Sequence, residues 1–270
     1  MIKKKFQRLS NNDKELIKQK TLLGESLNKI SKSMQLNKNT VYYNVRKFKP
    51  RVNREILIHN LSDTQVGELI GAFAGDGSYY HQNYSPIKKN STQHRIRYHL
   101  SFRDDWNYTR YLFSLLKKIN LNPFLIKDEA NGRLDISLSS KQFIEFIKCY
   151  LIWNDKKTLS ICLKKELGDY GENFLRGFAR GLMDTDGYVE ISNVSCACIS
   201  EKLINNLTQI FDRLKIKYKL TTKIREGRQK LFLVRVYSES LENYLENIGF
   251  SNKYKLESLR KILKKHNRKD

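Results

Sequence analysis

One segment of this chain occurs twice, 110 positions apart, at residues 67–77 and 177–187. Gly67 corresponds to Gly177, Gly71 to Gly181, and Asp76-Gly77 to Asp186-Gly187. Each copy has the apolar residues of one buried helix, with small residues four positions apart, and then an acid and a glycine. The duplication therefore predicts two related halves, with two matching carboxylates brought to one site at a pseudo-twofold axis.

Small residues follow one face of each repeated helix: Gly67, Gly71 and Gly75 in the first, and Gly177, Gly181 and Thr185 in the second. A glycine inside a helix costs up to about 1 kcal/mol relative to alanine, so two such stripes predict that the two backbones pack closely. Gly77 and Gly187 are predicted to end their helices in the left-handed conformation.

The acids Asp76 and Asp186 are predicted to lie at the negative ends of the two helix dipoles. Two carboxylates held there would repel each other, and a divalent cation that prefers oxygen ligands, such as Mg²⁺, would offset the repulsion. A single Asp-Gly after an apolar helix is also an ordinary helix end. The matching second copy favours the interpretation as a metal site.

Periodicity predicts an α+β fold with four segments. Residues 1–50 form a small all-α module, 51–63 a linker, 64–165 the first repeat and 166–270 the second. Each repeat is predicted to follow the order αββαββα, with helices starting near residues 64 and 172.

The formal net charge of the 270-residue chain is +23, which predicts a polyanionic partner, with nucleic acid favoured over an acidic membrane surface. No apolar run approaches the roughly 20 residues of a membrane span, and residues 1–6 lack the apolar core of a signal peptide. We therefore expect a cytoplasmic, nucleoid-associated protein.

The chain has four cysteines, Cys149, Cys162, Cys196 and Cys198. They lack zinc-type spacing and are expected to be reduced packing residues.

The segments Leu69–Gly77 and Ala179–Gly187 resemble the two motifs of the LAGLIDADG homing endonucleases. The resemblance extends over roughly residues 64–265, because the order of predicted elements also agrees. The first copy has Ala74 where the second has the acid Asp184.

The resemblance implies a metal-dependent DNA endonuclease that acts as a monomer. In that family the last acid of each motif binds divalent metal, a role that would fall on Asp76 and Asp186, assisted by the carbonyls of Gly75 and Thr185. The ion would be Mg²⁺ or Mn²⁺, and the product a double-strand break with 3′ overhangs. Lys157 and Lys255 would be the lysines near the site; the alternative for each is a solvated surface lysine.

Alternating strands predict a saddle of antiparallel sheets with basic faces, which would read a long pseudo-palindromic DNA site. Its expected contacts in the first repeat are Arg95, Arg97, His99, Arg103 and Arg133. Those in the second repeat are Lys217, Lys219, Lys223, Arg225 and Arg235. Asp135, Ser137 and Ser139 are expected on the same face as Arg133. A merely solvated amphipathic sheet is the alternative.

Residues 1–50 carry 13 Lys or Arg against 3 Asp or Glu and resemble a helix-turn-helix module, with Thr40 as the expected N-cap of the third helix. The residues expected to face a major groove are Lys38, Asn39, Thr40, Tyr42, Tyr43 and Arg46. A small helical cap with a solvated basic surface is the alternative.

Two other functions stay open for the whole chain. One is a DNA-binding regulator that kept the scaffold without catalysis, and the other is a maturase with intron RNA as its partner. Retention of both Asp76 and Asp186 favours the enzyme over the regulator. Nothing in the sequence separates a maturase from a nuclease.

Overall fold

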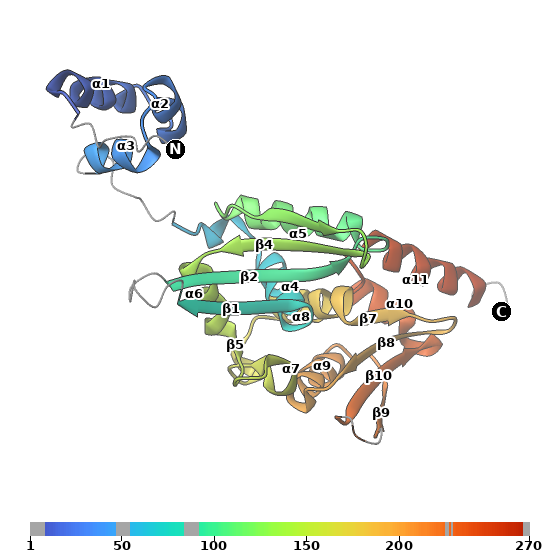
Figure 1. Ribbon diagram of the computed structural model, residues 1–270. Helices are drawn as coiled ribbons and strands as arrows, with labels where there is room; N and C mark the ends of the chain where they lie inside the picture. The colour runs from blue at the N-terminus through green and yellow to red at the C-terminus, as the bar shows by residue number, and fades with distance from the viewer. Residues whose placement is uncertain (1–8, 47–54, 84–91, 225–226, 228, 267–270) are drawn as a thin grey trace. The chain divides into compact units, whose positions relative to one another are not determined.

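A computed structural model describes residues 9–46, 55–83, 92–224, 227 and 229–266 (Figure 1). The chain divides into two compact units, Met1–Arg54 and Glu55–Asp270. The first unit is helical, and the second is the α+β unit that carries the repeated helices. The predicted α+β class is therefore confirmed.

Three helices form the first unit: α1 (Asn11–Leu22), α2 (Leu27–Ser33) and α3 (Lys38–Val45). They pack around Ile17, Ile30, Val41 and Val45. The third helix begins earlier than its sequence suggests, because the side chain of Asn37 accepts a hydrogen bond from the Asn39 amide. The expectation that Thr40 is the N-cap is wrong, since Asn37 provides an equally good cap three residues earlier.

The second unit contains two four-stranded antiparallel sheets of equivalent topology, ordered β1-β2-β4-β3 and β7-β8-β10-β9. The first sheet comprises β1 (Gly77–Asn83), β2 (Thr92–Ser101), β3 (Phe124–Asp128) and β4 (Arg133–Ser139). The second comprises β7 (Gly187–Val189), β8 (Asn193–Cys198), β9 (Lys219–Lys223) and β10 (Leu231–Tyr237). The helices are α4 (Asp63–Ala74), α5 (Trp106–Lys118) and α6 (Lys141–Tyr150), then α8 (Glu172–Thr185), α9 (Glu201–Arg213), α10 (Ser238–Asn247) and α11 (Lys253–His266). The predicted order αββαββα is confirmed in both repeats.

Short elements join the repeats and precede the first one. They are β5 (Leu151–Ile152), α7 (Lys157–Ser160), β6 (Cys162–Leu163) and the 3₁₀ turns η1 (Ile58–Asn60) and η2 (Leu167–Asp169). β5 pairs with β6, and α7 lies between them in sequence. Elements this short leave no periodicity in the sequence, which therefore predicts none of them.

The repeated helices α4 and α8 lie side by side (Figure 1) with their backbones in contact. A Cβ atom added to Gly71 would overlap the carbonyl oxygen of Phe178, and one added to Gly181 would overlap that of Glu68. The glycine stripes therefore serve close packing, as predicted. Gly77 and Gly187 do not have the expected left-handed conformation. No larger residue fits at these positions, because a Cβ would collide with the carbonyl oxygen of Phe73 or of Met183, one turn back in the same helix.

One hydrophobic core runs through the second unit and includes the facing sides of α4 and α8. Cys196 and Cys198 belong to it, whereas Cys149 is exposed, so the expectation that all four cysteines are packing residues is wrong for Cys149. In the part of the chain that the structure describes, no helix combines the length and apolar character needed to cross a membrane.

Candidate active site and nucleic-acid interface

The two predicted acids lie together where α4 and α8 end. Asp186 is the C-cap residue of α8, and Asp76 follows the C-cap Gly75 of α4. Gly75 packs against the opposite helix end, since a Cβ there would lie 3.1 Å from Cγ of Asp186. Asp76, Asp186 and Lys157 line one cavity of about 230 Å³. The structure therefore brings residues from both repeats into a single site.

Burial, more than any charge nearby, makes these carboxylates weak acids. Burial, followed by repulsion from Asp186, raises the pKa of Asp76 to about 7. Burial raises the pKa of Asp186 to about 6, although Lys157 and Lys255 act against it. Burial therefore disfavours the ionised carboxylates near neutral pH, and a bound cation would favour them.

Two lysines bind the last carbonyl groups of the two helices in matching ways. Lys157 Nζ donates to the carbonyl oxygens of Ala74 and Gly75, both at 2.8 Å. Lys255 Nζ donates to those of Met183 (3.2 Å), Asp184 (2.6 Å) and Thr185 (3.3 Å). The last carbonyls of a helix generally lack amide partners within it, although that of Met183 also accepts from the Asp186 amide, and cations suit the negative end of the dipole. Burial lowers the pKa of Lys157 to about 8, against the opposing effect of the acids.

The residues present fit a hard divalent cation that keeps most of its water. Two carboxylates are available, and Mg²⁺ commonly binds through one or two carboxylates together with substrate phosphates. The carbonyls of Gly75 and Thr185, which the resemblance implies as ligands, accept hydrogen bonds from Lys157 and Lys255. Within the described ranges, no group of three or more His, Cys, Asp and Glu side chains could enclose an ion on its own. Remaining ligands must therefore come from water or substrate.

The burial and contacts of the acid Asp184, within the second motif, were not predicted. Asp184 accepts hydrogen bonds from the amides of Ser251 and Asn252, both at 3.0 Å. The buried Asn252 side chain donates to Asp105 of the first repeat and accepts from the amide of Tyr254. This chain of contacts fixes the start of α11, which carries Lys255. The sequence signals a difference between the repeats at one position, where the second copy has Asp184 and the first has Ala74.

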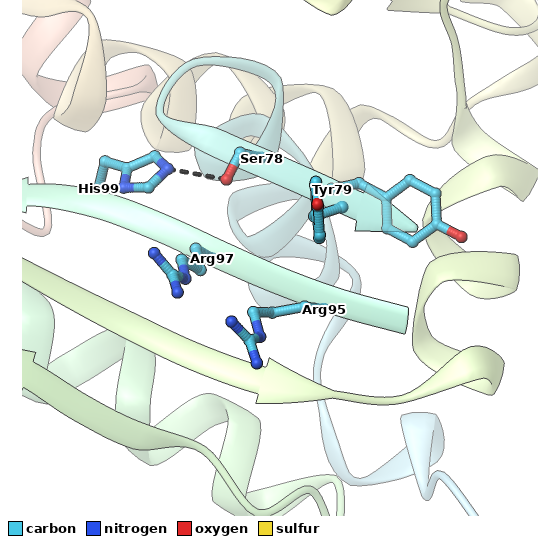
Figure 2. A pocket seen from close by; sticks show the side chains of 6 residues that line it. Ser78, Tyr79, Arg95, Arg97 and His99 are labelled. Carbon is cyan, nitrogen blue, oxygen red and sulfur yellow. Dashed lines mark hydrogen bonds between the residues drawn. The ribbon is translucent and has the colours of Figure 1, made fainter. Parts of the chain in front are cut away.

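The first sheet presents a basic face with an acid at its centre. Arg95, Arg97 and His99 of β2 line a cavity of about 510 Å³ together with Ser78, Tyr79 and Tyr80 (Figure 2). Arg133 is exposed on β4. Asp135 and Ser137 lie on the same face as Arg133, opposite His99 and Arg97 in the register, but they are buried among the side chains of that face. Arg103 lies in the turn after β2 rather than on the strand as expected.

Asp135 is buried because basic neighbours surround it. Its carboxylate accepts hydrogen bonds from Arg133 Nε and His99 Nδ1, and Arg97 Nη1 lies 3.8 Å away. Burial raises the pKa of Asp135, but the hydrogen bonds from Arg133 and His99 outweigh it and the net shift is downward. The acid is therefore held in its ionised form.

The second sheet lacks the expected uniform basic face. Lys219 and Lys223 lie on the outer strand β9, while Lys217 precedes it. Leu220 and Thr222 on that strand are also exposed, so the predicted alternation of buried and exposed residues is wrong there. Arg235 is half-buried and lies 4.0 Å from Glu190. Arg225 lies outside the described residues.

The third helix of the first unit carries the residues predicted to face a groove. Lys38, Asn39, Tyr43 and Arg46 are exposed, whereas Thr40 and Tyr42 are half-buried. The guanidinium of Arg46 lies 4.9 Å from the centre of the Tyr43 ring, as in a cation–π contact. A basic and aromatic surface therefore lies along α3.

Comparisons with known proteins agree with this fold. Residues 173–249 match the family model of the LAGLIDADG-like domain. The chain thus contains a LAGLIDADG-like domain and has the LAGLIDADG fold, and the resemblance drawn from the two motifs is confirmed.

Among solved structures, the fold is similar to that of the homing endonuclease I-DmoI in complex with DNA and Mn. The two share 13% sequence identity and a TM-score of 0.53, and the match covers 69% of this chain and 96% of that one.

Two curated proteins of Methanocaldococcus jannaschii are also similar. The replication factor C small subunit is 29% identical over 215 residues, which are 78% of this chain and 11% of that protein. An uncharacterized protein is 22% identical over 250 residues, which are 87% of this chain and 84% of that protein. The chain therefore spans only a small part of the first relative.

Proposed function

We propose that this chain is a site-specific, metal-dependent DNA endonuclease that cuts both strands and leaves 3′ overhangs. One observation carries the proposal: Asp76 and Asp186, from two repeats, meet at adjoining helix ends, and each end is bound by a lysine. A scaffold that only binds DNA gains nothing from two half-buried carboxylates at adjoining helix ends. Similarity to I-DmoI, solved with DNA and Mn, supports the same substrate class.

Asp76 and Asp186 would hold Mg²⁺ or Mn²⁺, with water and phosphate oxygens as further ligands. Such an ion would supply a more acidic water and stabilisation of the leaving 3′ oxygen. Lys157 and Lys255 donate to the helix-end carbonyls, and their positive charges would stabilise the phosphate charge that builds up during hydrolysis. Because one chain supplies both acids, it would act as a monomer.

We further propose a role for each segment. Residues 1–50 would be a helix-turn-helix module whose α3 surface contacts a major groove, and 64–165 and 166–270 the two repeats. The linker predicted at 51–63 would end before Glu55, since the residues from Glu55 on belong to the second unit. The exposed Lys38, Asn39, Tyr43 and Arg46 support this assignment. Binding to chromosomal DNA would place the protein at the nucleoid.

The test is cleavage of a pool of DNA duplexes, including the sequence that flanks the gene, with Mg²⁺, with Mn²⁺ and with chelator. We expect discrete double-strand cuts with 3′ overhangs that require metal and vanish in Asp186→Asn. Asp169→Asn, which changes an exposed acid before the N-terminal end of α8, the end opposite Asp186, should cut like wild type. Specific binding without cutting would contradict the proposal and favour the regulator, or the maturase if intron RNA also bound.

A further inference from the structure

The two sheets can be compared position by position. Gly77 pairs with Tyr98 in the first sheet, and Gly187 pairs with Cys196 in the second, so Tyr98 and Cys196 are equivalent. Tyr98 then pairs with Ile136, and Cys196 with Val234, which fixes the next strand. This register makes Arg95, Arg97 and His99 equivalent to Asn193, Ser195 and Ala197, and Arg133 and Asp135 equivalent to Leu231 and Leu233.

The charged cluster of the first sheet has no counterpart at those positions. In the first repeat Asp135 binds Arg133 at 2.7 Å and His99 at 2.9 Å, with Arg97 at 3.8 Å. In the second repeat the equivalent Leu233 is apolar and buried, and Ser195 bonds its neighbour Asn193. The basic residues of the second sheet lie on its outer strand or, for Arg235, beside Glu190.

The cluster also has donors that the protein leaves unused. Within the described part of the chain, the buried Nε of Arg97 has no hydrogen-bond partner, and neither has the Ser137 hydroxyl opposite it in the register. Figure 2 shows Arg95, Arg97 and His99 along one strand, at a cavity of about 510 Å³. Guanidinium donors held in one plane match the O6 and N7 acceptors of guanine in the major groove.

Ser78, His99 and Asp135 form a line of hydrogen bonds, 2.7 Å and 2.9 Å long, which has the spacing of a nucleophile relay. Arg133 argues against that role. It donates two hydrogen bonds to Asp135 and also contacts Nδ1 of His99 at 2.7 Å. The carboxylate is therefore already compensated and would not stabilise an imidazolium, so the cluster orients side chains rather than moving protons.

We infer that the first repeat reads guanine in its half of the DNA site, that the second repeat discriminates little, and that Asp135 is the positioning residue that holds the reading side chains. The chain would then recognise a functionally asymmetric site in spite of its internal duplication. This inference rests on the proposed DNA binding but not on catalysis. All measurements below are therefore made in chelator, where cutting plays no part.

The experiment selects binding sites for the full chain from random duplexes, and then measures the dissociation constant for every single base-pair change. We expect changes at one or two guanine positions in one half to weaken binding by about fivefold to about 100-fold. Changes in the other half should weaken it by less than about threefold. Arg97→Ser, which introduces the residue found at the equivalent position 195, should abolish the guanine preference.

Asp135→Asn tests whether Asp135 positions the side chains that read guanine or merely keeps the protein folded. Loss of a negative charge should raise affinity for random DNA, while the guanine preference falls at the same base pairs. A variant that merely unfolds would lose both. Glu190→Gln is the matched control, since it removes the acid beside Arg235 and should raise random-DNA affinity without changing the preference in the first half.

If base-pair changes weakened binding equally in both halves of the DNA site, the inference would be overturned while the nuclease proposal stayed intact. An unchanged guanine preference in Asp135→Asn would overturn the positioning role. Enrichment of no sequence at all would overturn the proposed function, and the inference with it.

Discussion

At the residue scale, two carboxylates lie where a helix least favours negative charge. Asp76 and Asp186 are partly buried at the negative helix ends. Burial, joined for Asp76 by repulsion from Asp186, raises the pKa values of both. Lys157 and Lys255 reduce these shifts only in part, because their ammonium groups donate to backbone carbonyls. The remaining cost of ionisation is consistent with a site prepared for a cation.

This electrostatic cost gives stability a pH dependence in the absence of metal. Because the folded pKa of Asp76 is raised to about 7, its favourable contribution is full below pH 3.8 and is lost as the pH rises through 7. Asp76→Asn, which cannot ionise, should therefore raise the free energy of unfolding at pH 8 by about 4 kcal/mol and change it little at pH 4. Denaturation in chelator at pH 4 and pH 8 measures this, with the exposed acid Glu246→Gln as control. An equal effect of Asp76→Asn at both pH values would contradict the assignment.

Asp184 fixes the start of α11, which carries Lys255, whereas Ala74 at the equivalent position of the first repeat has no carboxylate to do the same for Lys157. Asp184→Ala would leave the buried amide of Asn252 unpaired, at a cost of about 1–3 kcal/mol, and would loosen the start of α11 with Lys255. We expect nicked DNA to accumulate, because only one of two strand cuts slows. Gel analysis of a plasmid substrate detects this, and Lys255→Met should slow the same strand. Slowing of the opposite strand by Lys255→Met, or of both strands equally by Asp184→Ala, would show that Asp184 does not act through Lys255.

At the element scale, the contact between α4 and α8 depends on backbone touching backbone. A Cβ at Gly71 or Gly181 would collide with a carbonyl oxygen of the other helix, and a backbone atom cannot swing away as a side chain can. The same contact sets the spacing of Asp76 and Asp186. Stability and the geometry of the site are thus coupled through the glycine stripes.

Gly71→Ala and Gly181→Ala should each lower the free energy of unfolding by about 3 kcal/mol, since the helices must move apart. Gly168→Ala is the matched control, because nothing lies within 4 Å of a Cβ there, and it should change stability little. Chemical denaturation of the three variants compares them directly. A loss in Gly168→Ala as large as in Gly71→Ala would refute close packing as the cause.

Sequence patterns sufficed for elements that repeat over many residues. The stripe at Gly67, Gly71 and Gly75 predicted the helix pair, and alternation along β2 predicted its buried face. Contacts that join distant residues left no such pattern. Asp184 meets Asn252, and Asn252 meets Asp105, across long stretches of chain. Alternation also failed on β9, because an edge strand can expose both faces.

At the scale of the whole molecule, the first unit carries basic residues of its own, in addition to those of the sheets in the second unit. A chain without residues 1–54 keeps the complete core of the second unit and should stay folded. Its DNA affinity should fall, and the slope of log affinity against log salt should become shallower by about one for each phosphate that the shortened chain no longer binds. Binding isotherms at several salt concentrations measure this. An unchanged slope would mean that the first unit does not touch DNA.

The central claim is that one chain supplies both acids of one metal-dependent site. The most direct measurement is DNA cleavage in Mg²⁺ by wild type, by Asp76→Asn, by Asp186→Asn, and by a mixture of the two variants. We predict that wild type cuts both strands, and that neither variant nor their mixture makes a double-strand break. Restored cutting in the mixture would show that two chains share a site, and full activity of either variant would show that its acid is not required.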